Sequence, residues 1–227
     1  MPRNRRDRDF ALTEVEKKGR EQKEELVAKI RDEVKDAAYV YVIQHKNLVS
    51  SKMGNVRELL QVATKEHPGG RIFNGKKRVM AIALSGEDVP AGLDGLVKDI
   101  SGDSMLFVSS SGPKLVQSFF NKYSEPVAAT AGNIATEDVE IPEGPLDKIE
   151  FPFPLEPRLR ALGLPCKLHE GVITLLHDYT ICNEGDELTA KQAKLLTHFG
   201  YEMANMTFKV TSYWSKSAKA NPVKKLA

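Results

Sequence analysis

The chain has 227 residues, of which 41% are hydrophobic and 28% charged, with 33 Lys and Arg against 31 Asp and Glu. This length can bury one sizeable core, or a core with a smaller satellite domain. No run approaches the roughly 18 apolar residues of a spanning helix, and the N-terminus lacks the apolar centre of a secretory signal. The two cysteines are too few for a disulfide scaffold, so a reducing compartment is expected. Composition thus excludes membrane, collagen-like, disulfide-knot and wholly disordered classes.

Acidic and basic residues are segregated along the chain. Residues 127–204 contain 13 Asp and Glu but 6 Lys and Arg, a net charge of −7. The rest contains 27 Lys and Arg and 18 Asp and Glu, a net charge of +9. This asymmetry predicts two modules that divide at 126/127 and 204/205. A basic module most often faces nucleic acid or an acidic partner, although a charged run can also be a solvated face.

The first element is expected to be a helix. Thr13 and Glu16 fit a capping box, and apolar residues then recur with helical spacing. These apolar residues are Leu26, Val27, Ile30, Val34 and Ala37. Residues 14–25 differ, because only Val15 is apolar among several cations. This half of the helix has little to bury, so we expect it to project from the core or to lie on a partner.

Strands and helices then alternate. The expected strands are residues 39–43, 71–73 and 105–108. The expected helices begin at Ser50 or Ser51, at Gly75, and between Ser111 and Pro113. Their apolar faces comprise Val56, Leu59, Leu60 and Ala63, then Val79, Met80, Ile82 and Ala83, then Leu115, Val116, Phe119 and Phe120. The alternation predicts an α/β sandwich over a mixed sheet.

Prolines crowd the acidic segment and disfavour long regular elements there. We expect a strand over 171–176 and a helix over 189–196, with Thr189 near its N-cap. Residues 208–214 have the basic and aromatic character of the first module, so they are expected to add a final strand to its sheet. The tail, residues 215–227, has four lysines and no acid, which predicts disorder. The predicted domains are therefore 1–126 with 205–227, and an inserted smaller α+β domain, 127–204.

The turn before the third helix is the most distinctive candidate binding site. Residues 70–77 have the outline of a nucleotide-binding P-loop, but Lys77 stands where that motif needs a hydroxyl group for Mg²⁺. Free N–H groups at a helix start, with Lys76, Lys77 and Arg78, instead indicate a site for backbone phosphate. An exposed basic turn without a ligand is the alternative.

No pattern typical of an enzyme is evident. Cys166, His169, His177 and Cys182 have a spacing that fits no standard zinc site. Nothing places a base and an orienting group beside either thiol, so an enzyme using Cys166 or Cys182 is a remote alternative. We expect no metal, no cofactor and no catalytic residue. The single tryptophan, Trp214, is expected to anchor the core rather than to stack on a base.

Several segments are similar to one protein family, in the same order along the chain. They are MPR at 1–3, KKGREQKE at 17–24, NLVSSKM at 47–53, FNGKKRV at 73–79, AATAG at 128–132, LGLP at 162–165, EGVI at 170–173 and GDEL at 185–188. These segments resemble the family of the large-subunit ribosomal stalk-base protein, P-zero in eukaryotes. They are more similar to its assembly-factor paralogues, the mRNA turnover protein 4 homologues. The likeness extends from Met1 to about Trp214.

The resemblance implies an rRNA-binding α/β domain interrupted by an insertion domain. It also implies that the start of the second helix and the Gly-Lys turn face rRNA of the GTPase-associated centre. The contacts carried over are Ser51, Lys52, Arg57, Gly75, Lys76, Lys77 and Arg78. Further candidates, from the N-terminal likeness and from charge, are Arg3, Lys17, Lys18, Arg20 and Lys23.

By the same resemblance, the chain is expected to be a non-enzymatic ribosome assembly factor. It would hold its rRNA site in nucleolar pre-ribosomes until it is exchanged for P-zero. The implied partners are large-subunit rRNA, the pre-ribosomal large subunit, a neighbouring stalk-base ribosomal protein and a release factor of the dual-specificity phosphatase family, with no membrane. The implied location is the nucleolus and nucleus, with shuttling to the cytoplasm left open.

Two related functions stay open. The first is P-zero itself, which continues into helices that hold the acidic stalk proteins, whereas this sequence stops at Ala227 after a basic tail. The second is an mRNA-turnover factor, as the family name suggests. Whether rRNA or mRNA co-purifies with the chain distinguishes this second function from assembly.

Overall fold

A computed structural model describes residues 19–64, 70–86, 88–218 and 223–226. The chain forms two compact units, one of Met1–Ile43, Thr64–Pro113 and Val210–Ala227, and the other of Gln44–Ala63 and Lys114–Lys209. These limits reflect the compactness of each unit. They do not test the domain boundaries expected at 126/127 and 204/205, which stay a prediction. The capping box predicted at Thr13 and Glu16 lies outside the described residues.

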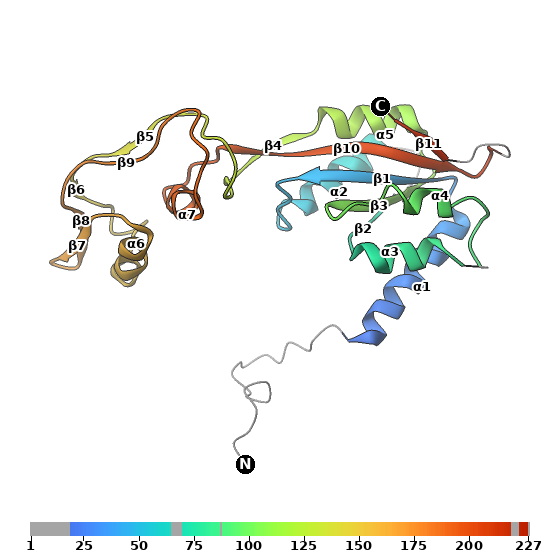
Figure 1. Ribbon diagram of the computed structural model, residues 1–227, viewed down its shortest axis with the longest axis horizontal. Helices are drawn as coiled ribbons and strands as arrows, with labels where there is room; N and C mark the ends of the chain where they lie inside the picture. The colour runs from blue at the N-terminus through green and yellow to red at the C-terminus, as the bar shows by residue number, and fades with distance from the viewer. Residues whose placement is uncertain (1–18, 65–69, 87, 219–222, 227) are drawn as a thin grey trace, which may run out of the picture. The chain divides into compact units, whose positions relative to one another are not determined.

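Helices and strands alternate as expected over the first half of the chain. The helices are α1 (Arg20–Asp36), α2 (Met53–Ala63), α3 (Lys77–Leu84), α4 (Asp94–Val97), α5 (Pro113–Lys122), α6 (Glu156–Leu162), α7 (Ala190–His198) and the short 3-10 helix η2 (Phe153–Leu155). The strands are β1 (Tyr39–Lys46), β2 (Arg71–Phe73), β3 (Ser104–Ser109), β4 (Ser124–Val127), β5 (Val139–Ile141), β6 (Gly144–Pro145), β7 (Cys166–His169), β8 (Val172–Leu175), β9 (Tyr179–Cys182), β10 (Ala204–Ser215) and β11 (Val223–Lys225). Figure 1 shows their course.

The described strands form one large and two small sheets. The six-stranded sheet has the order β11-β10-β1-β3-β2, and β4 also pairs with β10. The small sheets are β5-β9 and β6-β8-β7, both within residues 128–203. This confirms the predicted α/β class, a sandwich domain with a smaller inserted α+β part.

In the first unit, α1 and α3 lie side by side and pack on the sheet strands (Figure 1). Ile30 and Val34 of α1 are fully buried against apolar residues of α3 and of the strands. Side chains alternate across each strand, so Val40 and Leu106 join this core while Tyr41 points to the opposite face. There Tyr41 stacks on Phe107, with ring centroids 5.8 Å apart.

The strand expected at residues 208–214 is confirmed as part of β10, and it joins the large sheet beside β1. Its pattern alternates between buried and more exposed residues, as a strand with two differently covered faces requires. Trp214 is buried in the core of the first unit, and its indole Nε1 donates to the carbonyl oxygen of Ala91 at 3.3 Å. Core anchoring is therefore its observed role.

The disorder expected for residues 215–227 is wrong for the part that the structure describes. Residues 223–225 form β11, antiparallel to β10, and Leu226 N–H donates to Thr211 O at 2.8 Å. Lys225 Nζ lies 2.9 Å from Asp99 Oδ1, and the Asp99 side chain is only 7% exposed. The lysine-rich composition wrongly indicated disorder. The Asp99 carboxylate and the open edge of β10 are enough to order residues 223–225.

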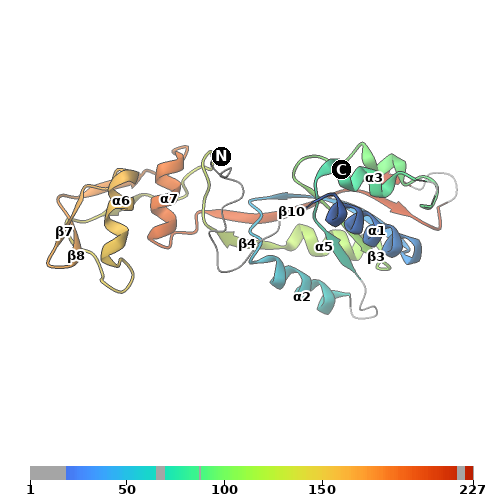
Figure 2. The ribbon, with the colours of Figure 1, turned by 90° about the horizontal axis from the view of Figure 1, so that it is seen from below.

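In the second unit, β4 and the start of β10 form a stem that carries the inserted segment (Figure 2). Val127 pairs directly with Ala204, and Ser124 with Thr207, in antiparallel register. Residues 128–203 therefore leave and return at neighbouring positions. Phe208 packs on Phe120 at 5.6 Å between ring centroids, so α5 lies against the returning strand.

Within the inserted segment, the expected strand over 171–176 is confirmed as β8 and the expected helix as α7. Thr189 caps α7 in a capping box with Gln192. The short strands β5, β6, β7 and β9 were not predicted, since strands of two to four residues are too short to show a clear period in sequence.

Several predicted inward-facing residues lie outside the core. Leu59, Ile82 and Leu115 are 50%, 58% and 42% exposed, and Ala63 is also exposed. In α2, only Met53, Val56 and Leu60 are buried, which is a narrow stripe of one residue per turn. Leu59 lies beside that stripe, about 100° around the helix from Leu60 and about 60° from Val56, and its side chain is turned toward the exposed side.

Candidate nucleic-acid interface

The Gly-Lys turn leads from β2 into α3. Lys76 occupies the N-cap position of α3, and no side chain caps this helix. The backbone N–H groups of Val79 and Met80 donate to Lys76 O. Lys76, Lys77 and Arg78 are all exposed. A helix N-terminus carries a partial positive charge, so three cations there favour an anion such as a phosphate.

Gly75 packs closely against α1. A Cβ atom there would lie 3.1 Å from Leu26 Cδ2 of α1, closer than ordinary van der Waals contact. The turn therefore lies directly against α1, and a side chain at position 75 would require Leu26 to shift by a few tenths of an ångström.

A groove of about 560 Å³ lies between the turn and α1. Lys23 and Lys29 line it from α1, and Gly75 and Lys76 from the turn, over an apolar floor that includes Leu26. The structure thus brings three predicted residues, Lys23, Gly75 and Lys76, to one site. Lys29 was missed, although it follows Gln22 and Leu26 at helical spacing of four and three, which places all three on one face.

One acidic residue reduces the positive charge of this groove. Glu25 also lines the groove, and its carboxylate lies 3.7 Å from Lys29 Nζ with both side chains more than 60% exposed. An exposed pair of this kind is worth less than about 1 kcal/mol, so it leaves Lys29 available to an incoming phosphate.

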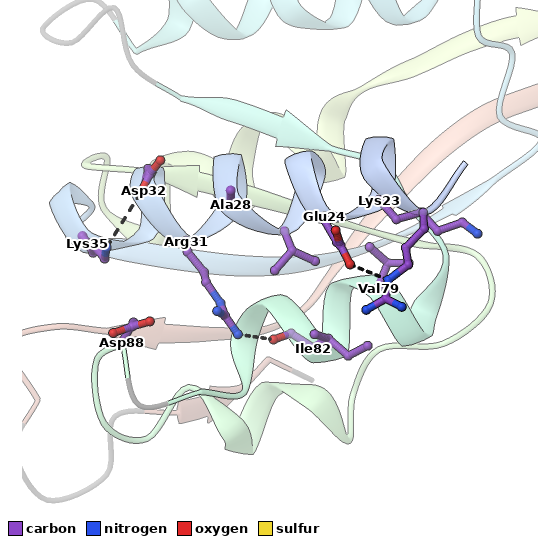
Figure 3. A pocket seen from close by; sticks show the side chains of 11 residues that line it. Lys23, Glu24, Ala28, Arg31, Asp32, Lys35, Val79, Ile82 and Asp88 are labelled. Atoms are coloured by element: carbon purple, nitrogen blue, oxygen red, sulfur yellow. Dashed lines mark hydrogen bonds and ion pairs between the residues drawn. The ribbon is translucent and has the colours of Figure 1, made fainter. Parts of the chain in front are cut away.

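A second groove, of about 660 Å³, lies on another side of α1, toward α3 (Figure 3). Cations and acids alternate around it, with Lys23, Arg31 and Lys35 against Glu24, Asp32 and Asp88. Arg31 donates to the carbonyl oxygens of Ile82 and Ser85 at 3.1 and 3.2 Å, where α3 ends. Arg20, a predicted contact, pairs with Glu24 at 2.6 Å, and both side chains are more than 60% exposed. The mixed charge makes this groove a poorer phosphate site than the Gly-Lys turn.

At the start of α2, the predicted contacts differ in exposure. Ser51 and Arg57 are exposed, and Arg57 lies beside the buried stripe of the helix, about 60° around the axis from Leu60. Lys52 is only 25% exposed, and its ammonium group pairs with Glu125 and Glu202 at 3.7 and 3.2 Å. The start of α2 belongs to the second compact unit and the Gly-Lys turn to the first. Arg3, Lys17 and Lys18 lie outside the described residues.

The two cysteines are buried and unlinked to one another. Burial raises the pKa of both thiols, which favours the less nucleophilic protonated form. Among the described residues, no group of three His, Cys, Asp or Glu side chains could hold a metal ion. In the same part of the chain, no helix combines the length and the apolar character needed to cross a bilayer.

Comparison with known families defines the class of protein. Residues 18–125 match the family described as Ribosomal protein L10, and residues 129–200 match the family described as the insertion domain in the corresponding 60S ribosomal protein. The second match lies inside the segment carried by the β4–β10 stem. The chain thus has the organisation of an L10-type protein with an insertion domain.

Full-length relatives make the family more specific. The protein named ribosome assembly factor mrt4 of Neurospora crassa is 33% identical, over 96% of this chain and 91% of its own length. The protein of that name from Schizosaccharomyces pombe is 31% identical, over 95% and 92%. The chain belongs to this mrt4 family, which confirms the resemblance inferred from the sequence. Large ribosomal subunit protein uL10 of Thermococcus gammatolerans is 29% identical, over 48% of this chain and 32% of its own length.

Proposed function

We propose that this chain is a non-enzymatic ribosome assembly factor that binds large-subunit rRNA in pre-ribosomes. The observation that carries RNA binding is the exposed run Lys76, Lys77 and Arg78 at the start of α3, beside Lys23 and Lys29 of α1. Such a cationic surface suits a phosphate backbone. The assembly role is supported by the printed names of the relatives that match over nearly their whole length.

The finer proposal concerns the site. The rRNA is that of the GTPase-associated centre, and the chain holds it until P-zero takes its place. This follows from the family resemblance at residues 51–57 and 75–78. A release factor of the dual-specificity phosphatase family and the neighbouring stalk-base protein are the proposed partners in this exchange. The expected location is the nucleolus and nucleus.

Crosslinking followed by sequencing of bound RNA tests this function. The expected result is a peak of crosslinks in the GTPase-associated centre of large-subunit rRNA. Crosslinks concentrated on mRNA would replace the proposal with an mRNA-turnover function. Crosslinks elsewhere in rRNA would keep the assembly role and overturn the site.

P-zero itself is the alternative within the same class. The mrt4 proteins of the two fungi are matched over more than nine-tenths of their length, whereas the archaeal uL10 is matched over a third. Purification of pre-ribosomes and of mature ribosomes separates the two functions. An assembly factor is expected in the first and depleted from the second, and equal abundance in both would favour the ribosomal protein.

A further inference from the structure

The ammonium group of Lys52 is held by acidic and carbonyl groups of the protein itself. It donates to the carbonyl oxygen of Pro126 and to Glu202 Oε1 at 3.2 Å, and it lies 3.7 Å from Glu125 Oε1. The side chains of Lys52 and Glu125 are only 25% and 23% exposed. Solvent and salt therefore screen the pair of Lys52 and Glu125 less than an ordinary surface pair, whereas the Glu202 side chain is 46% exposed and is screened more.

These partners belong to both strands of the β4–β10 stem. Glu125 and Pro126 lie on β4, where the chain leaves for the inserted segment. Glu202 lies two residues before β10, where the chain returns. Val127 pairs with Ala204, so one lysine at the start of α2 contacts both the outgoing and the returning chain near the end of the stem.

The loop before Lys52 is fastened to the same elements. Asn47 Nδ2 donates to Asn205 O of β10 at 3.1 Å, and Asn47 Oδ1 accepts from Asn133 Nδ2 of the inserted segment at 3.5 Å. Asn47 has a φ of 52°, a left-handed conformation that asparagine tolerates better than most residues. The loop from Asn47 to Lys52 thus connects a predicted RNA-binding element with the stem.

The charge balance at Lys52 disfavours a phosphate in this arrangement. Two carboxylates face one ammonium group, which leaves a local excess of negative charge. The second oxygen of Glu125 accepts from the Tyr123 hydroxyl, so it has its own partner and need not follow Lys52. A phosphate that approaches Ser51 and Lys52 meets the two acids unless the ammonium group leaves them.

We propose that Lys52 clamps the stem, that an RNA phosphate competes with Glu125 and Glu202 for its ammonium group, and that RNA binding thereby loosens the stem. This inference rests on the proposed function, because it requires RNA at the start of α2. The coupling is reciprocal, so the free energy by which the clamp weakens RNA binding equals the free energy by which RNA weakens the clamp.

Removal of a competing acid tests the competition. Glu202→Gln should bind an rRNA fragment of the GTPase-associated centre about 1.5- to 5-fold more tightly than the unchanged protein, the range for one partly exposed ion pair. The matched control is Glu140→Gln, which removes the same charge from an exposed position of β5 outside the cluster. Equal affinities of the two variants would overturn the competition.

Hydrogen exchange tests the clamp and the loosening. In the free protein, Lys52→Met should speed amide exchange at residues 124, 125 and 127 and at residues 204–207, whereas Glu140→Gln should not. RNA should speed exchange at the same amides in the unchanged protein, and it should add little in Lys52→Met. Unchanged exchange in free Lys52→Met would overturn the clamp, and RNA that leaves or slows stem exchange would overturn the coupling.

The outcomes separate this inference from the proposed function. If the chain binds no RNA, both the proposed function and the competition fail. If it binds RNA while Glu202→Gln behaves like its control and stem exchange is unaffected, only this inference fails. Should Lys52→Met prove unfolded by circular dichroism, Glu125→Gln takes its place, because it removes a clamp partner without leaving an unpaired buried cation.

Discussion

Lysines of this chain differ in how readily they can meet a phosphate. Lys76 and Lys77 are exposed at an uncapped helix start, whereas Lys52 is engaged by two carboxylates. Sequence alone showed the run of cations at residues 76–78 but could not show this difference, because Glu125 and Glu202 are 73 and 150 residues from Lys52 in the chain. Lys29 was overlooked for a related reason, since only the packing of the turn and α3 on α1 brings the turn to this lysine.

The first prediction concerns the turn. The double variant Lys76→Ala/Lys77→Ala should bind rRNA roughly 10- to 30-fold more weakly at 0.15 M salt, because two phosphate contacts and their counterion release are lost. The slope of log K against log salt should become shallower by about 1.4 to 1.8. Both quantities come from a titration of one rRNA fragment over a series of salt concentrations.

The control for this variant is Lys191→Ala/Lys194→Ala. It removes the same charge from exposed positions of α7 in the acidic segment. That variant should leave the slope unchanged. If both double variants gave the same slope as the unchanged protein, the Gly-Lys turn would not be part of the interface.

Among the elements, those with a clear period or a distinctive composition were predictable. The strand at residues 208–214 could be assigned to the first sheet from its basic and aromatic character, and α7 from Thr189 and its helical pattern. β4 has the sequence Ser-Glu-Pro-Val and β11 the sequence Val-Lys-Lys, so neither shows a strand pattern. Both exist because β10 offers them a backbone to pair with, which is a tertiary effect.

The second prediction concerns β11. Lys225→Met should loosen this strand, because it leaves the nearly buried Asp99 carboxylate without its cation at 2.9 Å. Limited proteolysis should then cut the segment after Ser215 several-fold faster than in the unchanged protein. Lys224→Met is the matched control, since Lys224 is exposed on the same strand, and it should be cut at the original rate. Equal cleavage of both variants would contradict a role for the Asp99 pair.

The third prediction concerns the stem as an element of domain organisation. Deletion of residues 128–203, with a short linker from Val127 to Ala204, should leave a folded core, because these two residues are already paired neighbours. The deletion also removes the whole net charge of −7 of the acidic segment, since Val127 and Ala204 are neutral, so RNA binding should not weaken. Circular dichroism tests whether the shortened chain folds, and the rRNA titration tests whether it still binds RNA. Loss of folding would show that the insertion is structural, and loss of binding alone would show that it contacts RNA.

At the scale of the whole molecule, the segregation of charge agrees with the family organisation. The acidic stretch at residues 127–204 nearly coincides with the match to the insertion domain at 129–200, and the basic remainder includes the L10 match at 18–125. Charge could therefore indicate the modules before any comparison. It could not indicate what the RNA is, because a phosphate backbone attracts any suitably placed cations.

Competition between this chain and purified P-zero on one rRNA fragment of the GTPase-associated centre tests the central claim most directly. Two proteins that present matching surfaces at residues 51–57 and 75–78 to the same phosphates cannot bind together. Each protein should therefore displace the other, with occupancy set by relative affinity and concentration. A stable ternary complex of both proteins with a single rRNA would contradict the claim that this chain holds the site for P-zero.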